Sequence, residues 1–324
     1  MTLLPFIFSA CKEEAKPGTG EVEFIDDALS NLINKDAKVE IISEGFDWSE
    51  GPLWIEQEQM LLFSDVPKNI IYKWTEAKGK EIYLQPSGYT SDEKRGGEIG
   101  SNGLTLSAEG KLLICQHGDR RVAMMDAPLN APKPNFIVLA SEYQGKKFNS
   151  PNDCVARSNG DIFFTDPPYG LEQNMSDPKK EIPFQGVYKV DQHGRVTLLV
   201  DSISRPNGIA FTPDGKTLIV ASSDEVKKNW YAFDVGPNDS LMNGRVFYDA
   251  SKAEGMGLPD GLKIDKQGNI FATGPGGVWI FNKTGNLIGK IKVHGVPTSN
   301  CAFTPDEKTL FITADNYVLR VKLR

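Results

Sequence analysis

The chain has 324 residues, of which 24% are charged and 40% are hydrophobic, and its net charge is −7. This is the ordinary balance of a folded globular protein with enough apolar residues to build a core. The negative net charge argues against nucleic acid or an anionic membrane surface as a partner.

The first 36 residues differ in composition from the rest of the chain. An apolar run, LLPFIFSA, ends at Cys11 and is followed by the polar stretch KEEAKPGTG. Small residues before a cysteine are typical of a bacterial lipoprotein signal, although a Lys or Arg at its start is missing. We expect residues 1–36 to be a signal or lipoprotein-like segment and linker, with a lipid anchor at Cys11. The expected location is the bacterial cell envelope, periplasmic or membrane-anchored, in preference to the cytoplasm. The alternative is an apolar N-terminus without this role.

Residues 37–324 contain six repeats of one pattern. In each repeat an oxygen-bearing residue precedes an apolar strand, a polar turn and a second apolar strand. The six residues are Glu50, Asn102, Asn152, Asn207, Asp260 and Asn300. They lie about 40 to 55 positions apart, which is the period of a β-propeller blade.

Further strands complete each repeat, such as GVYKV with VTLLV in the third. Four antiparallel strands form one blade. We therefore expect an all-β fold, a six-bladed β-propeller with four-stranded antiparallel blades. The last repeat lacks an outer strand, and residues 38–43 are expected to supply it. A β-sandwich is the alternative, but six units of this length exceed a normal sandwich.

The six oxygen-bearing residues are expected to meet at one mouth of the propeller channel. Oxygen ligands that converge from several blades suit a hard cation such as Ca²⁺. Where glycine follows, as after Asn102, Asn207 and Asp260, turn chemistry is an alternative reason for the residue type. The antiparallel hairpins bring the ends of the second strands to the same mouth. Those residues are Asp65, His117, Asp166, Ser222 or Ser223, Gly274 and Asp315.

Other features carry structural expectations. Asp153 is expected to point away from the channel, because successive strand side chains alternate between faces. Cys115, Cys154 and Cys301 lie in apolar strands without a spacing motif, so buried, unpaired thiols are expected. Two loops, 90–101 and the insertion from Asp166 to about Gln185, are expected to cover the mouth.

Several motifs together resemble one known family, SMP-30/gluconolactonase/LRE-like proteins, and particularly its bacterial gluconolactonases. They are SEGPLW, SNGLTL, CQHGDRRV, FNSPNDCV, FTDPPYGL, RPNGIAF and LPDGLKID. The resemblance implies one divalent metal held by Glu50, Asn152, Asn207 and Asp260. Two carboxylates and two carboxamides would balance a dication, with Ca²⁺ the first expectation and Zn²⁺, Mg²⁺ or Mn²⁺ the alternatives. Ser150 stands where animal members carry a substrate-contacting Arg, as it does in bacterial gluconolactonases.

The activity implied by the resemblance is metal-dependent hydrolysis of a sugar lactone, with D-glucono-1,5-lactone giving D-gluconate as the first expectation. Asp260 is the base that the resemblance suggests, and His117 is the alternative because imidazole titrates near neutrality. Substrate contacts are expected from Asn102, His117, Asn152, Tyr169 and Asn300. The alternatives are an organophosphate hydrolase of the same fold and a non-catalytic carbohydrate-binding propeller with a structural metal. The sequence does not indicate the oligomeric state.

Overall fold

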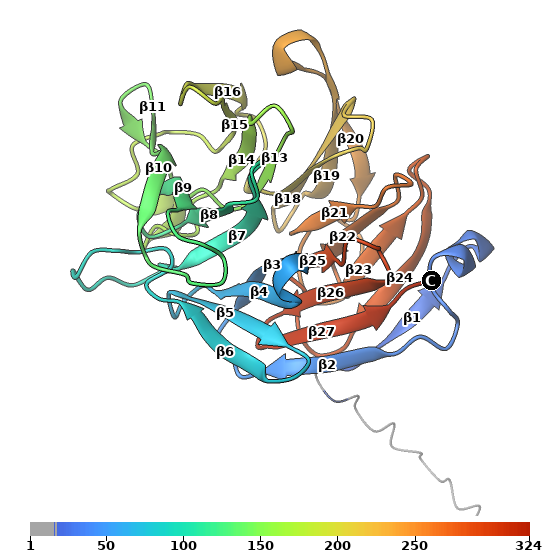
Figure 1. Cartoon of the computed structure of the whole chain (residues 1–324). Coiled ribbons are helices and arrows are strands. Elements are labelled where there is room, and N and C mark those ends of the chain that lie inside the picture. Colours follow the sequence, from blue (N-terminus) through green and yellow to red (C-terminus); the bar gives the residue numbers. More distant parts are fainter. Residues whose placement is uncertain (1–15, 17) are drawn as a thin grey trace, which may run out of the picture.

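The computed structural model describes residue 16 and residues 18–324, so the expectations for Cys11 lie outside the described residues. Within the described part, six antiparallel sheets are arranged around a central axis (Figure 1). The expected six-bladed β-propeller is therefore confirmed. No helix in this part is long and apolar enough to cross a membrane.

In the first four blades the innermost strand comes first in the chain, and the following strands lie progressively further out. The first and second blades consist of β3 (Ser49–Ile55), β4 (Met60–Asp65), β5 (Ile70–Thr75) and β6 (Gly79–Leu84), and of β7 (Ser101–Leu106), β8 (Leu112–Gln116), β9 (Arg121–Met125) and β10 (Phe136–Ala140). The third and fourth consist of β13 (Cys154–Ala156), β14 (Ile162–Asp166), β15 (Gly186–Val190) and β16 (Val196–Val200), and of β17 (Pro206–Phe211), β18 (Thr217–Ser223), β19 (Lys228–Val235) and β20 (Leu241–Asp249).

The last two blades each include a strand from the start of the chain. The fifth consists of β21 (Leu262–Ile264), β22 (Ile270–Gly274), β23 (Gly277–Phe281), β24 (Leu287–Val293) and β1 (Gly20–Phe24). The sixth consists of β25 (Asn300–Phe303), β26 (Thr309–Ala314), β27 (Tyr317–Lys322) and β2 (Val39–Glu44). A small hairpin and four short 3₁₀ helices complete the described chain: β11 (Glu142–Tyr143), β12 (Lys146–Lys147), η1 (Asp27–Asn31), η2 (Glu56–Glu58), η3 (Asn174–Ser176) and η4 (Pro237–Asp239).

The N-terminal strands close the ring. β2 pairs with β27 from Val39 opposite Val321 to Glu44 opposite Tyr317, which confirms the outer strand expected at residues 38–43. β1 was not expected, because residues up to 36 were assigned to a signal segment and linker. Its Val22 and Phe24 alternate with glutamates, and both pack against the core of the fifth and sixth blades. The structured propeller therefore extends to residues before 36.

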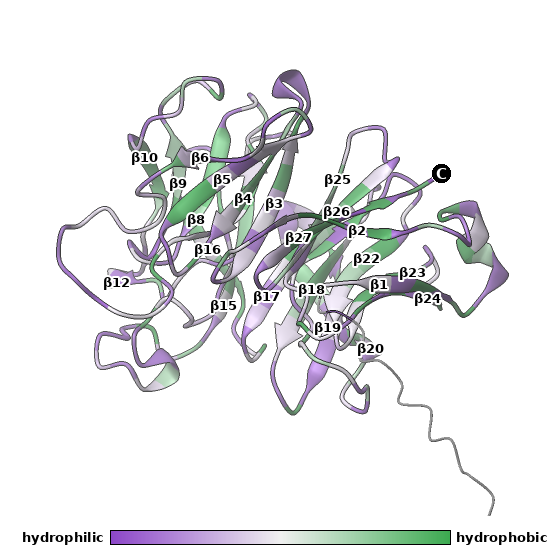
Figure 2. Ribbon diagram, turned by 90° about the horizontal axis from the view of Figure 1, so that it is seen from below, coloured by the Kyte–Doolittle hydropathy of each residue, from purple (hydrophilic) through white to green (hydrophobic). Residues whose placement is uncertain are grey.

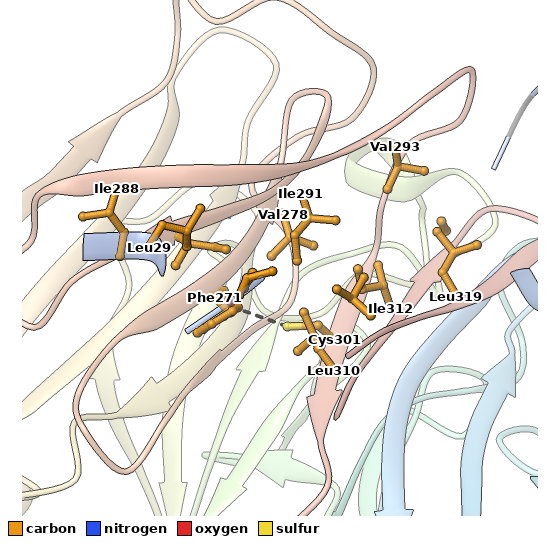
Figure 3. Close-up of a cluster of buried hydrophobic side chains, with 14 of the residues drawn as sticks. Leu29, Phe271, Val278, Ile288, Ile291, Val293, Cys301, Leu310, Ile312 and Leu319 are labelled. Carbon is orange, nitrogen blue, oxygen red and sulfur yellow. Dashed lines mark hydrogen bonds between the residues drawn. The ribbon is translucent and has the colours of Figure 1, made fainter. Parts of the chain in front are cut away.

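Apolar side chains fill the spaces between blades. Figure 2 shows hydrophobic residues concentrated on the strands and hydrophilic residues on the connecting loops. Figure 3 shows the cluster between the fifth and sixth blades, where Leu29 of η1 packs with residues such as Phe271 and Leu310. Cys301 lies in this cluster, and its thiol donates to the carbonyl of Phe271 across 3.5 Å. It is a buried free cysteine, as are Cys115 and Cys154, which confirms that expectation.

Candidate functional site

A cavity of about 330 Å³ opens where the innermost strands begin. Five of the six oxygen-bearing repeat residues line it, one from each of the first five blades. The cavity is lined by Trp48, Glu50, Glu98, Asn102, Asn152, Tyr169, Asn207, Ser223, Gly257, Leu258, Asp260, Pro297 and Thr298. The structure thus brings all four expected metal ligands together, with Asn102 and Tyr169 beside them.

The glycines that follow Asn102 and Asn207 have a packing role. A Cβ on Gly103 would lie 2.6 Å from the carbonyl oxygen of Asn152, and a Cβ on Gly208 would lie 2.3 Å from that of Asp260. Neither glycine has a positive φ. Turn chemistry is therefore not the reason for the residue pairs Asn102–Gly103 and Asn207–Gly208. The missing side chains let neighbouring innermost strands approach closely enough to crowd their first residues around the channel.

Three oxygen atoms at the cavity are buried but have no hydrogen-bond partner among the described residues: Oδ1 of Asn102, of Asn152 and of Asp260. A buried polar atom without a partner costs about 1–3 kcal/mol, so native proteins retain such atoms chiefly where a ligand satisfies them. Asn207 is oriented by a neighbour, because its Nδ2 donates to Ser223 Oγ across 2.9 Å. That contact leaves the amide oxygen of Asn207 available to a ligand.

The two carboxylates of the ring are held without a positively charged partner. Burial, opposed by the hydrogen bond from the Gly51 amide and aided by the neighbouring charge of Asp153, raises the pKa of Glu50 to about 8. Burial also raises the pKa of Asp260 well above its ordinary value, and the charges of Glu50, Asp153 and Glu98 add to this effect. Several like charges gathered in a buried site favour protonation unless a cation neutralises them.

These observations indicate that the residues fit a divalent cation. Among the described residues no three His, Cys, Asp or Glu side chains are grouped closely enough to hold a metal alone. Amide oxygens are therefore required, and Asn152 and Asn207 supply them beside Glu50 and Asp260. This all-oxygen donor set suits Ca²⁺ better than a metal that prefers nitrogen or sulfur.

A second polar layer lies behind the cavity. Asn300 Nδ2 lies 3.4 Å from Glu50 Oε2 and 3.4 Å from Asp153 Oδ2. Its Oδ1 accepts from the Cys301 amide at 2.9 Å and from Lys263 Nζ at 3.3 Å. Lys263 Nζ is also 3.9 Å from Asp153 Oδ2. Asn300 is not among the residues that line the cavity, and its neighbours occupy both ends of its amide. Its expected contact with substrate stays a prediction.

The expected direction of Asp153 is wrong. Its Oδ2 faces Asn300 of the sixth blade, so it points into the channel, while its Oδ1 accepts from the Cys154 amide at 3.0 Å. Regular pairing of β13 begins only at Cys154. Strand alternation therefore does not apply to Asn152 and Asp153, and both side chains turn inward.

His117 lies one layer behind the cavity surface, and its side chain is fully buried. Its Nε2 is 3.4 Å from Asn152 Nδ2, and its Nδ1 is 3.4 Å from Glu98 Oε2. His117 was expected at the mouth as a base or substrate contact. The structure places it behind Asn152 and Glu98, and it is not among the residues that line the cavity.

The ends of the second strands have different roles from blade to blade. Only Ser223 of the expected set lines the cavity. Asp166 accepts from the amides of Asn149 and Ser150 at 2.8 Å each. Asp65 accepts in the same way from the amides of Asp47 and Trp48 at 3.1 and 3.3 Å. Buried carboxylates in two blades thus hold the backbone that leads into a ring residue.

Ser150 holds the loop that carries Tyr169. Its hydroxyl donates to the carbonyl of Pro167 at 2.5 Å and accepts from the amide of Gly170 at 2.9 Å. Ser150 is fully buried and does not line the cavity, whereas Tyr169 does. The position at which animal members of the resembled family carry Arg therefore has a loop-positioning role here.

Six cavity residues were missed from the sequence: Trp48, Glu98, Gly257, Leu258, Pro297 and Thr298. Trp48 and Leu258 stand two positions before Glu50 and Asp260, so the same spacing could have identified them. Together with Pro297 they give the cavity an apolar wall from the fifth, sixth and first blades. Glu98 lies in a loop where no periodic pattern marked it.

Comparisons with known proteins agree with this architecture. The family model described as SMP-30/Gluconolactonase/LRE-like region matches residues 48–316. A gluconolactonase from Zymomonas mobilis is 38% identical over 94% of this chain and 86% of its own length. Lactonase drp35 of Staphylococcus aureus is 28% identical over 97% of this chain and 90% of its own length. A solved structure of a gluconolactonase from Xanthomonas campestris has a TM-score of 0.81 and 28% identity, with 97% of this chain and 99% of that chain covered.

Proposed function

This chain belongs to the SMP-30/gluconolactonase/LRE-like family and is a lactone hydrolase, and we propose that its substrate is a sugar lactone, D-glucono-1,5-lactone, opened to D-gluconate. The observation that carries the proposal is the ring of buried, unpartnered oxygens at the base of a cavity large enough for one sugar ring. The gluconolactonase from Zymomonas mobilis, similar over 94% of this chain, supports the choice of substrate.

We propose that Glu50, Asn152, Asn207 and Asp260 hold one divalent cation, with Ca²⁺ the best match to their oxygen donors. When bound, the cation would polarise the lactone carbonyl and stabilise the negative charge that develops on its oxygen. The two carboxylates supply two negative charges, which balance a dication. Without a cation, burial and mutual repulsion raise the pKa values of both carboxylates, and a bound dication would offset this repulsion.

The rest of the cavity suits the two kinds of surface on a sugar lactone. Trp48 and Leu258 present an apolar wall against which the C–H face of a sugar ring packs. Asn102 and Tyr169 also line the cavity, and their polar groups bind ring hydroxyls or the water that attacks the carbonyl. These contacts fix the carbonyl carbon beside the ring of oxygens, and this positioning lowers the activation barrier.

The test of this proposal is acid release by the purified protein, followed in a pH-stat with D-glucono-1,5-lactone in the presence of Ca²⁺. Hydrolysis well above the spontaneous rate is expected. An alkyl lactone without hydroxyl groups and a phosphotriester serve as comparison substrates. A higher kcat/KM for either would show that glucono-lactone is the wrong substrate.

We also propose, from the sequence around Cys11 alone, that the protein is anchored in the cell envelope. Expression of the full chain in a Gram-negative host should place it in the membrane fraction. The Cys11→Ser variant should lose this association. Equal distribution of both proteins would contradict the proposal.

A further inference from the structure

Lactone hydrolysis needs a group that accepts a proton from the attacking water, and this requirement rests on the proposed function. Glu50 and Asp260 are poor candidates, because a bound cation lowers the basicity of the carboxylates that ligate it. His117 is also unsuitable, because its ring is fully buried and its Nε2 faces the amide of Asn152. A carboxylate that lines the cavity without belonging to the metal ring would meet the requirement.

Glu98 is such a carboxylate. It lines the same cavity as Glu50 and Asp260, and its side chain is 37% exposed, so water reaches it. It does not start an innermost strand, and it belongs to the loop between β6 and β7. Its charge contributes to the raised pKa of both Glu50 and Asp260, which places it near the metal ring.

His117 supplies a matching contact behind Glu98. Asn152 Nδ2 is a hydrogen-bond donor, so a neutral His117 ring accepts from it at Nε2. The ring proton is therefore on Nδ1, which points toward Glu98 Oε2 at 3.4 Å. That buried N–H has no completed hydrogen bond among the described residues. A small inward shift of Glu98 would complete it, and catalytic hydrogen bonds often shorten in this way when substrate binds.

The loop that carries Glu98 is held on both sides of this residue. Arg95 donates to the carbonyl of Gly118 at 3.3 Å and to that of Gly170. On the other side, the Gly100 amide donates to Val66 and its carbonyl accepts from His117, at 2.8 and 3.1 Å. Glu98 is therefore placed by fixed backbone rather than by a free loop.

We propose that Glu98 is the general base of the reaction, oriented by the N–H of His117. The water oxygen bonds to the lactone carbonyl carbon while one water proton moves to the Glu98 carboxylate. The tetrahedral adduct then collapses and the ring C–O bond breaks. The proton on Glu98 passes to the departing ring oxygen, which yields the hydroxy acid and restores the carboxylate. In this role Asp260 binds metal, and its carboxylate does not accept the proton.

The test compares Glu98→Gln with Glu93→Gln in the full chain at saturating Ca²⁺. Both variants remove one negative charge from the same loop, but Glu93 is exposed and does not line the cavity. Glu98→Gln should lower kcat by about 100-fold or more while KM and Ca²⁺ affinity remain close to wild type. Glu93→Gln should retain wild-type activity. In a Glu98→Ala variant, added formate should restore part of kcat in a saturable manner, because it replaces the missing carboxylate.

Three results would overturn the assignment of Glu98. One is a Glu98→Gln variant whose kcat stays within about tenfold of wild type, less than general-base catalysis contributes. Another is a raised KM at unchanged kcat, which would make Glu98 a substrate-binding residue. The third is a loss of Ca²⁺ affinity without rescue by formate, which would place Glu98 in the metal site. A wild-type protein without lactonase activity would instead refute the proposed function, and the base assignment with it.

Discussion

Two polar layers lie in the channel. The outer layer lines the cavity and consists of Glu50, Asn152, Asn207 and Asp260, and the inner layer behind it consists of Asp153, Asn300 and Lys263. In the inner layer, Asp153, Asn300 and Lys263 satisfy one another, with one carboxylate matched by one ammonium group. In the outer layer, Glu50 and Asp260 have no such cation, and Oδ1 of Asp260 has no partner among the described residues. The inner layer is complete without a ligand, whereas the outer layer requires one.

This difference separates polar residues that stabilise the propeller from those that act. Both layers contain Asp and Asn, so the presence of these residue types alone does not distinguish the layers. Partner satisfaction does, since a buried group that lacks a partner lowers stability unless a ligand supplies that partner.

The largest effect is expected from Asp260→Asn. It removes one of the two carboxylates that balance the cation, so activity should fall by about 10³-fold or more. Steady-state acid release from the lactone measures this loss. The matched change Asp153→Asn in the inner layer should lower activity far less. Equal losses in the two variants would mean that the layers do not differ in function.

A second effect concerns the pH dependence of Ca²⁺ binding. Burial raises the pKa of Glu50 to about 8 and that of Asp260 above its ordinary value in the protein without cation. Below these values both groups hold protons that the cation must displace, so affinity should rise with pH and level off above them. Each displaced proton should change the Kd about tenfold per pH unit. Calorimetric titrations at several pH values measure it, and a pH-independent Kd between about pH 6 and pH 8 would contradict this account.

A third effect separates stability from activity in the inner layer. Lys263→Met leaves the carboxylate of Asp153, which is only 3% exposed, without its cation. The free energy of unfolding should fall by about 1–3 kcal/mol, because a buried charge then lacks its partner. Urea unfolding at neutral pH measures the change. The kcat at saturating Ca²⁺ should stay within about tenfold of wild type, because Lys263 does not line the cavity. Unchanged stability would show that Asp153 does not depend on Lys263 for its neutralisation.

The smallest effect is expected from Ser150→Ala. The variant loses the hydroxyl that joins Pro167 to Gly170, at a cost of about 1 kcal/mol. Because Tyr169 lies between these two residues, KM for the lactone should rise a few-fold while Ca²⁺ affinity stays constant. If instead KM is unchanged, Ser150 does not position Tyr169 for substrate.

The fold and the outer layer were predictable because their signals are local and repeated. Each ring residue stands directly before an apolar strand, and the repetition reveals the propeller. The inward direction of the Asp153 side chain was not predictable, because it depends on the regular pairing of β13 beginning only after this residue, at Cys154. The positions of His117 and Asn300 behind the cavity surface were not predictable either. His117 lies against Glu98 of a loop, and Asn300 lies against Lys263 of the neighbouring blade. No spacing in the sequence reports such contacts.

The most direct test of the account is a Ca²⁺ titration of chelator-stripped protein, with D-glucono-1,5-lactone hydrolysis and thermal stability followed in parallel. We predict that Ca²⁺ raises the melting temperature and restores hydrolysis over the same concentration range. Asp260→Asn should abolish both responses, whereas Glu93→Gln should retain them. Full hydrolysis by stripped protein, or a melting temperature that ignores Ca²⁺, would contradict the claim that the open oxygens form a catalytic metal site.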